Sequence, residues 1–377
     1  MDFDLSEEQR MLKESARHFL SKECPKDLVR KLDESDEGYS SELWQKMAAL
    51  GWMGLVVPEE YGGIGGSFLD LAVLFEEMGY NICPGPFFST VVLGGMTVLI
   101  FGREEQKIEF LPKIARGEIK LTLALTELSA ICDASSIQVT AALDNDEYVI
   151  RGTKLFVPDA NVADYFLCVA RTEEGINPED GLTIFLVDAK SPGIECTLLK
   201  TLARDKQCEI VFNDVRVTKE NVLGRVNLAW TAVIDVLEKA ALARCAEMIG
   251  GAQAVMDMAL LYARERTQFN HPIGSFQAIQ HYFANMWMDI NGSRFILYKA
   301  AWKVSELTRA SKEIAMAKAR IGGAYRRVTS FGHQIFAGIG FTKEHDMHLY
   351  HRRSIAGDQA FGDQDFQRKK VARELGL

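Results

Sequence analysis

The sequence lacks the features that mark several classes of protein. It has seven cysteines, an odd number with no C-x-x-C spacing, so we expect neither a disulfide framework nor a zinc ribbon. Its seven histidines include no H-E-x-x-H, and the group His345, His348 and His351 lies among charged residues. We therefore expect no metal site. The acidic N-terminal residues contain no apolar run, so we expect no secretory signal.

Basic charge and long apolar runs are also scarce. The net charge is −9, which argues against nucleic acid or an anionic membrane as the main partner. Residues 78–102 carry no charge, but Pro84 and Pro86 interrupt the run. The remainder is too short to span a bilayer comfortably, so we expect a buried helix and no membrane span. Free cysteines in apolar runs, such as Cys168, predict a reducing, cytoplasmic location.

Hydrophobic periodicity divides the chain into three blocks. The first is helical and opens with the capping box Ser6–Gln9. The second contains short β-branched or aromatic runs between turn residues, and the third is helical again. We therefore predict an α+β fold with domains at 1–121, 122–227 and 228–377. The expected helices are 41–51, 67–80, 88–102, 104–116, 229–267, 275–307 and 311–337, and the expected strands are 137–140, 148–150, 165–169, 182–187 and 209–212.

Common nucleotide and nucleophile motifs are missing. The sequence contains no G-x-G-x-x-G, no G-x-x-x-x-G-K-[ST] and no G-x-S-x-G. A Rossmann site, a P-loop and a nucleophile elbow are therefore not expected. Composition and periodicity alone would indicate an α+β protein of enzyme size and no specific chemistry.

Three segments carry a resemblance to a known family. They are 125–133 (L-T-E-L-S-A-I-C-D), 262–280 (Y-A-R-E-R-T-Q-F-N-H-P-I-G-S-F-Q-A-I-Q) and 334–341 (Q-I-F-A-G-I-G-F). Together they resemble motifs of the acyl-CoA dehydrogenase family of flavoproteins, and the resemblance covers essentially the whole chain. It implies an N-terminal α-helical domain, a β-barrel-like middle domain and a C-terminal four-helix bundle. FAD would lie between the last two, with its ADP end reaching a second subunit.

The resemblance also assigns cofactor-binding residues. Thr126 would donate to the flavin pyrimidine edge, and Phe156 would supply the aromatic ring over the flavin. Pro158 stands where the family has a hydroxyl residue near flavin N5, and it has no donor. The ADP and pyrophosphate end would be held by Arg266, Gln268, Phe269, Gln277, Gln334, Ala337 and Gly338.

Each of these residues also has an ordinary structural interpretation. Thr126 fits a strand, and Arg266 could cap a helix end as a last-turn cation. Gln277 and Gln334 could be surface amides. The first motif is degraded as well, because Leu128, Ile131 and Cys132 replace proline, glycine and serine. Cys132 stands at a usual contact for the thioester chain, so substrate binding is less firmly implied there than FAD binding.

The two positions that hold the catalytic base in the family lack a carboxylate. Alignment places Phe361 at one of them and Ala240, 29 residues before Phe269, at the other. The nearest carboxylate on the same helix face is Glu247, two turns or about 10 Å beyond Ala240. Glu247 could be the base, with Arg244 and Phe361 near the substrate, or it could form an i,i+3 ion pair with Arg244. Glu238 faces roughly the opposite side of the helix.

The expected function is an FAD-dependent acyl-CoA dehydrogenase. The family reaction removes an α-proton from an acyl-CoA and transfers the β-hydride to flavin N5, and electrons leave to an electron-transfer flavoprotein. A homotetramer, or a heterotetramer with a related subunit, is expected. Three alternatives stay open: an FAD-containing subunit of a heteromer with an inert site of its own, a non-enzymatic FAD- or acyl-CoA-binding assembly subunit, and a flavin oxidase.

Overall fold

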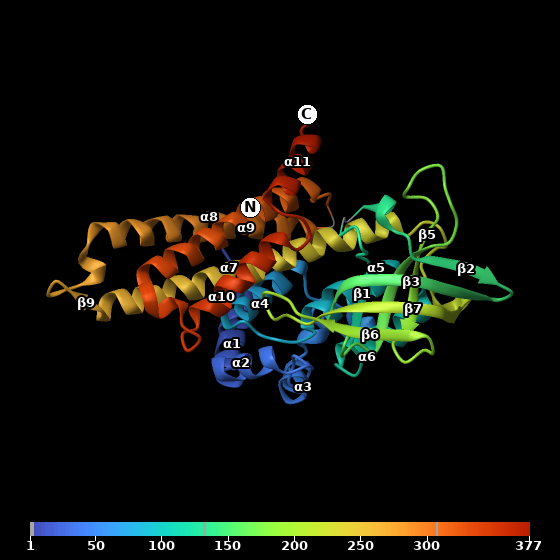
Figure 1. The fold of residues 1–377 in the computed structure, drawn as a ribbon, viewed down its shortest axis with the longest axis horizontal. Helices are drawn as coiled ribbons and strands as arrows, with labels where there is room; N and C mark the ends of the chain where they lie inside the picture. Colours follow the sequence, from blue (N-terminus) through green and yellow to red (C-terminus); the bar gives the residue numbers. More distant parts are fainter. Residues whose placement is uncertain (1–3, 131–132, 307) are drawn as a thin grey trace. The chain divides into compact units, whose positions relative to one another are not determined.

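The computed structural model describes residues 4–130, 133–306 and 308–377. Its helices and strands follow the helical, β and helical order predicted from the sequence (Figure 1). The α-helices are α1 (Glu7–Glu23), α2 (Lys26–Glu34), α3 (Ser41–Ala49), α4 (Phe68–Asn81), α5 (Met96–Phe101), α6 (Glu104–Ala115), α7 (Trp230–Glu265), α8 (Gln277–Ser305), α9 (Ser311–Phe336), α10 (Met347–Gln359) and α11 (Gln364–Glu374). The strands are β1 (Leu121–Ala124), β2 (Thr140–Asp144), β3 (Glu147–Pro158), β4 (Tyr165–Arg171), β5 (Leu182–Asp188), β6 (Ile194–Leu199), β7 (Gln207–Thr218), β8 (Val222–Leu223), β9 (Thr267–Gln268) and β10 (His271–Pro272).

The chain forms two compact units that do not follow the sequence order. Unit 1 combines the chain up to Val29 with 67–83 and 238–377, and unit 2 combines 30–66 with 84–237. Packing thus groups α1 and α4 with the C-terminal helices. The predicted boundaries at 121 and 227 stay predictions.

Unit 1 is a layered helical structure in which long helices bury an apolar stripe. On α9 the buried residues Ile314, Ala317, Ile321, Ala324 and Val328 recur every three or four positions, the spacing of one helix face. This face packs in a unit where α8, α10 and α11 all contact α9, and α4 contacts both α1 and α8. No helix in the described parts of the chain combines the length and apolar character that a membrane crossing requires.

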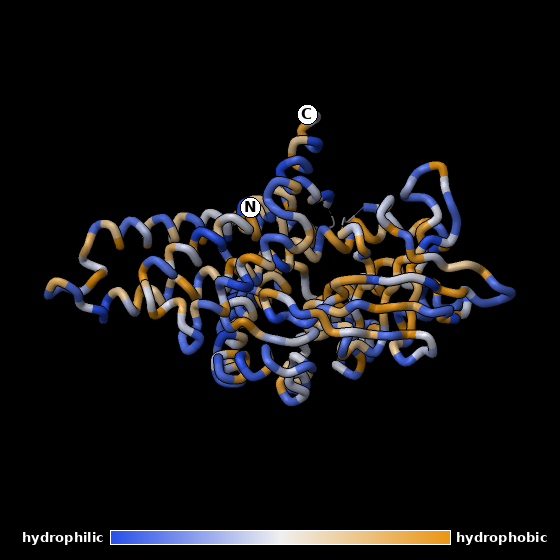
Figure 2. The backbone as a smooth tube through the Cα atoms, in the orientation of Figure 1, coloured by the Kyte–Doolittle hydropathy of each residue, from blue (hydrophilic) through white to orange (hydrophobic). Residues whose placement is uncertain are grey.

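Unit 2 is built on one mixed sheet. Its strands are ordered β6-β7-β3-β2-β4-β5-β8, and β1 pairs with β4 in parallel. Strand β4 is buried from Phe166 to Ala170, because both faces of this part of the sheet are covered. Figure 2 shows hydrophobic residues along the strands and hydrophilic ones at the turn between β2 and β3.

Two predicted elements differ from the structure. Residues 137–139 are not a strand, because the N–H groups of Gln138 and Val139 donate to the Glu127 carboxylate instead of to a neighbouring strand. The single helix predicted over 88–102 is a π-helical turn at Ser89–Gly95 followed by α5. A Cβ at Gly94 would come within 2.4 Å of Leu121 Cβ, so this segment packs unusually close to β1.

Candidate active site

Thr126 lies next to Glu127 in the sequence, and the buried ion pair of Glu127 with Lys154 positions it. Its carbonyl accepts the Leu155 N–H at 2.8 Å, which fixes the segment beside β3. Glu127 turns inward, is 5% exposed, and accepts the ammonium of Lys154 at 2.6 Å. Lys154 is fully buried and also donates to the Leu125 carbonyl at 3.1 Å. The Lys154–Glu127 pair therefore fixes the backbone on both sides of Thr126.

Phe156 faces outward because β3 carries a bulge at this point. Between Lys154 and Val157, β3 has one residue more than β7 opposite it, and Phe156 adopts a φ of 53°. Such a bulge redirects a side chain away from the regular alternation, and Phe156 is 48% exposed. The carbonyl of Pro158 accepts the Thr122 hydroxyl at 2.6 Å. The bulge and this bond place three predicted cofactor residues, Thr126, Phe156 and Pro158, along neighbouring backbone.

In unit 1, the predicted pyrophosphate residues lie in a tight hairpin. Phe269 and Asn270 connect β9 to β10 with φ values of 51° and 62°, as a primed two-residue turn requires. Phe269 is 86% exposed, and its ring meets Phe276 edge-on at 6.2 Å. Arg266 and Gln268 are exposed as well. Within the described residues, no carboxylate pairs with the Arg266 guanidinium, so its donors face solvent.

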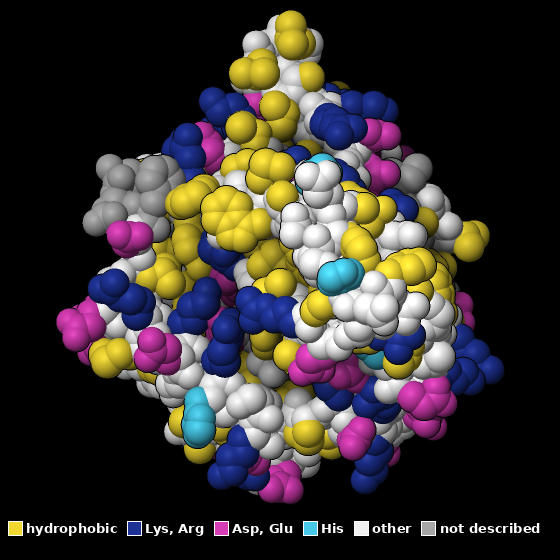
Figure 3. Space-filling model, turned by 90° about the vertical axis from the view of Figure 1, so that its left-hand side faces the viewer, with side chains coloured by type: hydrophobic (Ala, Val, Ile, Leu, Met, Phe, Trp, Pro, Cys, Tyr) yellow, Lys and Arg dark blue, Asp and Glu magenta, His cyan; other side chains and the backbone are white. Residues whose placement is uncertain are grey.

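A pocket of about 440 Å³ opens beside this hairpin and is lined by Leu260, Arg264, Gln280 and Phe283, among others. Figure 3 faces this end of unit 1, where apolar side chains gather beside Lys and Arg side chains. Gln277 begins α8 and is exposed.

The end of α9 lies next to the end of α7. The rings of Tyr262 and Phe336 are 5.0 Å apart, so the exposed Gln334 belongs to the same region as the hairpin. Ala337 ends α9 with a φ of 53°. A Cβ added to Gly338 would meet no atom within 4 Å. The glycine therefore leaves open surface that another molecule can approach closely.

The predicted base region lies on α7. Ala240 is fully buried, and Glu247 forms an ion pair with Arg244 on the same helix. The predicted i,i+3 pair is thus confirmed, while 19% of the Glu247 side chain stays exposed. Glu238 is held elsewhere, by the Ser311 hydroxyl at 2.9 Å and by Lys370.

Phe361 lies on a backbone segment that buried groups hold in place. Its φ is 59°, and its carbonyl accepts the Gln367 amide at 2.7 Å. Lys318 is fully buried and donates to the carbonyls of Asp358 at 2.7 Å and Gly362 at 3.0 Å. Burial, with a contribution from the nearby Arg244, lowers the pKa of Lys318. The two hydrogen bonds of this lysine therefore hold the Phe361 segment against α9.

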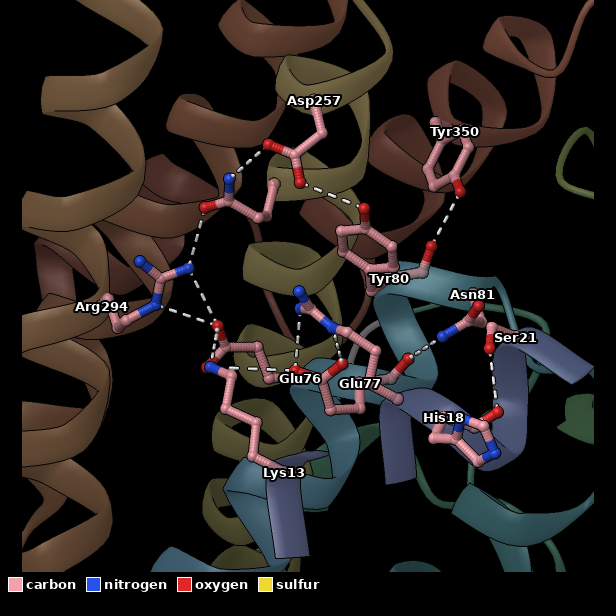
Figure 4. A network of polar contacts seen from close by, with 12 residues as sticks. Lys13, His18, Ser21, Glu76, Glu77, Tyr80, Asn81, Asp257, Arg294 and Tyr350 are labelled. Carbon is pink, nitrogen blue, oxygen red and sulfur yellow. Dashed lines mark hydrogen bonds and ion pairs between the residues drawn. The ribbon is translucent and has the colours of Figure 1, made fainter. Parts of the chain in front are cut away.

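A buried ionic network is centred on Glu76 of α4 (Figure 4). Glu76 on α4 is 1% exposed and accepts Lys13 at 3.0 Å, Arg294 at 2.9 Å and the Tyr298 hydroxyl at 2.7 Å. Burial alone would raise the pKa of Glu76, but Arg294 and Lys13 hold it below the ordinary value. The network thus fixes α4 against α1 and α8 with a charged carboxylate.

Helix α4 in turn touches the backbone of α7. A Cβ at Gly79 would come within 2.0 Å of the Glu247 carbonyl, and one at Gly250 within 1.7 Å of the Glu76 carbonyl. Glycine is needed at both positions because the two helices cross with their backbones in contact. The turn that carries Glu247 is therefore held rigidly.

The structure groups the predicted residues into sets within each unit. Thr126, Phe156 and Pro158 form one set in unit 2, and the hairpin and the end of α9 form another in unit 1. Cys132 lies outside the described residues. The sequence argument missed Lys154 and Lys318 as supports, because both lysines lie in elements that contain other charged residues and no local pattern distinguishes them.

Comparison with known families accounts for nearly the whole chain. The N-terminal, middle and C-terminal domains of acyl-CoA dehydrogenase match residues 6–118, 122–215 and 230–376.

Individual proteins agree with these matches. The probable acyl-CoA dehydrogenase YngJ of Bacillus subtilis is 33% identical, with all of both chains covered. The caffeyl-CoA reductase-Etf complex subunit CarC of Acetobacterium woodii is 32% identical over 92% of each chain. In the ChsE4-ChsE5 complex of Mycobacterium tuberculosis, a chain 28% identical superposes with a TM-score of 0.90, covering 100% of this chain and 99% of that one.

Proposed function

The chain belongs to the acyl-CoA dehydrogenase family of FAD-dependent oxidoreductases, and from that premise we propose that it removes the α-proton of an acyl-CoA with Glu247. The observation that carries the proposal is the position of Glu247 on α7, with 19% of its side chain exposed two turns from the buried Ala240. Since both usual base positions lack a carboxylate, Glu247 is the acid group of this helix face that can take the proton.

The environment of Glu247 suits a general base. Arg244 pairs with the Glu247 carboxylate and fixes its direction. The backbone contact with α4 at Gly79 prevents the turn from shifting, which keeps the carboxylate in one place. A base about 10 Å further along the helix than Ala240 requires an acyl group that places its α-carbon correspondingly deeper. We therefore expect slow reaction with simple straight-chain acyl-CoA.

The described residues fit FAD on their own geometry. Thr126 has a fixed backbone, Phe156 presents an exposed ring, Arg266 directs free donors outward, and Gly338 leaves open surface. A planar guanidinium suits phosphate oxygens. FAD, when bound, supplies the acceptor for the β-hydride. Pro158 cannot donate at the position where the family has a hydroxyl residue.

Assembly with further chains is part of the proposal. Met288, Phe295 and Trp302 on α8 are 56%, 54% and 39% exposed, and their seven-residue spacing puts them on one helix face. An exposed apolar face of this kind indicates a protein interface. A homotetramer, or a heterotetramer with a related subunit, would cover it. CarC is named as part of a complex with an electron-transfer flavoprotein, which supports such a protein as the redox partner.

Anaerobic bleaching of the flavin by a panel of acyl-CoA thioesters tests the function. We expect bleaching by bulky or branched acyl groups and slow bleaching by butyryl-CoA. Moving the carboxylate to its usual place with Ala240→Glu or Phe361→Glu should raise the butyryl-CoA rate tenfold or more. If no thioester bleaches the flavin, the chain is a non-enzymatic subunit or needs a partner's base. Rapid reoxidation of the reduced flavin by oxygen would indicate an oxidase.

A further inference from the structure

We propose that Cys24 and Cys83 form a redox-active dithiol that closes to a disulfide and cross-links α1 to the chain leaving α4. The two thiols share a hydrogen bond in which Cys83 donates to Cys24. Both are free cysteines, separated by more than fifty residues in the sequence, and both lie in unit 1.

The backbone around the two thiols is fixed on both sides. Cys24 ends α1, and its N–H donates to the Leu20 carbonyl at 2.9 Å. Cys83 follows the left-handed Ile82 that ends α4, and its N–H donates to the Met78 carbonyl at 2.9 Å. Because both helix ends are held, the thiols stay in contact in the reduced protein.

A second contact joins the segment after α1 to the end of α4. The Lys26 ammonium, two residues after Cys24, donates to the Asn81 carbonyl at 2.7 Å, two residues before Cys83. It also lies 5.4 Å from the centre of the Tyr350 ring. A disulfide would therefore form between segments that already touch.

The hydrogen bond and the nearby charges shift the pKa values of the two thiols in opposite directions. The hydrogen bond from Cys83, together with Lys26 and Arg353, lowers the pKa of Cys24, while burial opposes the shift. The pKa of Cys83 is raised, chiefly because it donates to Cys24. Cys24 is thus the acceptor in the hydrogen bond between the two thiols. It is 1% exposed, whereas Cys83 is partly exposed.

The exchange is balanced with a small disulfide such as oxidised glutathione as oxidant. Cys83, the more exposed thiol, loses its proton to solvent and attacks the glutathione disulfide, which forms a mixed disulfide and releases one glutathione thiolate. Cys24 gives its proton to that thiolate and attacks the Cys83 sulfur, which releases the second glutathione, protonated from solvent. Two protein thiols are oxidised and one glutathione disulfide is reduced to two thiols.

A cross-link at this location would affect the turn of α7 that carries Glu247. Cys83 lies near enough to Glu247 for the carboxylate to contribute to its raised pKa, and α4 touches the Glu247 backbone at Gly79. Closing the disulfide draws the end of α4 toward α1 and changes the packing against that turn. We expect oxidation to slow substrate-dependent flavin reduction at least fivefold, an effect that rests on the proposed role of Glu247.

Other cysteines provide matched comparisons. Cys168 and Cys245 are buried and isolated, and burial raises the pKa of each to about 12. A second thiol pair, Cys196 and Cys208, joins β6 to β7 in unit 2. The experiment therefore uses a Cys196→Ser background, in which that pair cannot close.

The test oxidises the purified flavoprotein with glutathione disulfide, alkylates free thiols and identifies cross-linked tryptic peptides by mass spectrometry. We expect the peptide Glu23–Lys26 linked to the peptide Met47–Arg103, reversibly with dithiothreitol. Cys24→Ser should abolish the link and Cys168→Ser should leave it intact. Absence of this cross-link under conditions that close Cys196–Cys208 in the wild type would overturn the proposal. This readout does not depend on activity, so an inert enzyme would not obscure it.

Discussion

The Lys154–Glu127 pair allows a quantitative prediction that joins stability to cofactor binding. Lys154→Met would leave the Glu127 carboxylate, 5% exposed, without its cation. Breaking a buried ion pair by removing one partner costs about 3–5 kcal/mol. Glu127 keeps two backbone N–H donors, from Gln138 and Val139, so we expect the lower end, about 3 kcal/mol.

The assay is urea unfolding followed by circular dichroism, with flavin release measured in parallel. The control is Arg151→Met on the same strand, because Arg151 pairs with Asp214 at the surface, each side chain 64% exposed. An exposed pair of this kind contributes about 0–1 kcal/mol. Lys154→Met should also weaken flavin binding, since it frees the backbone of Thr126. If Lys154→Met destabilises the protein no more than Arg151→Met, the reasoning is refuted.

Three further predictions concern other parts of the chain. Arg266→Ala should lower flavin content, because it removes charge-assisted hydrogen bonds that contribute roughly 1.5–3 kcal/mol, whereas the control Arg309→Ala should leave it unchanged. Unchanged flavin content in Arg266→Ala would show that Arg266 does not bind the pyrophosphate. Burial and the neighbouring histidines lower the pKa of His333 to about 4, so between pH 6.5 and 4 the unfolded chain binds a proton at this histidine that the folded protein does not, and stability falls with pH. His333→Phe should lose less stability over that range in urea melts, and an equal loss would contradict the assignment. Phe295→Lys on α8 should reduce the oligomer mass measured by light scattering, and an unchanged mass would exclude that face as an interface.

Local signals in the sequence predicted many elements correctly. The capping box at Ser6 and Gln9 opens α1 as expected. The predicted strands at 165–169 and 182–187 lie within β4 and β5. The edge strand β6 was missed because its residues 195–197 are exposed, so it shows no alternation of buried and exposed positions.

The site could be predicted through its motifs, but its supports could not. The Arg244–Glu247 pair follows from helical spacing. The bonds of Lys318 to the carbonyls of Asp358 and Gly362 depend on tertiary packing between α9 and the end of α10. The contact of Gly79 with Glu247 likewise joins residues far apart in the chain, so no local sequence pattern predicts it.

The role of Glu247 is tested most directly by α-proton exchange, which requires the base and no net flavin reduction. The measurement is the rate at which a bleaching acyl-CoA exchanges its α-protons with D₂O on the enzyme, followed by NMR, for wild type, Glu247→Gln and the control Glu238→Gln. General-base catalysis contributes about 10²–10⁴-fold. Glu247→Gln should therefore slow exchange at least a hundredfold while Glu238→Gln exchanges like wild type. Equal exchange in wild type and Glu247→Gln would contradict the account and place the base elsewhere.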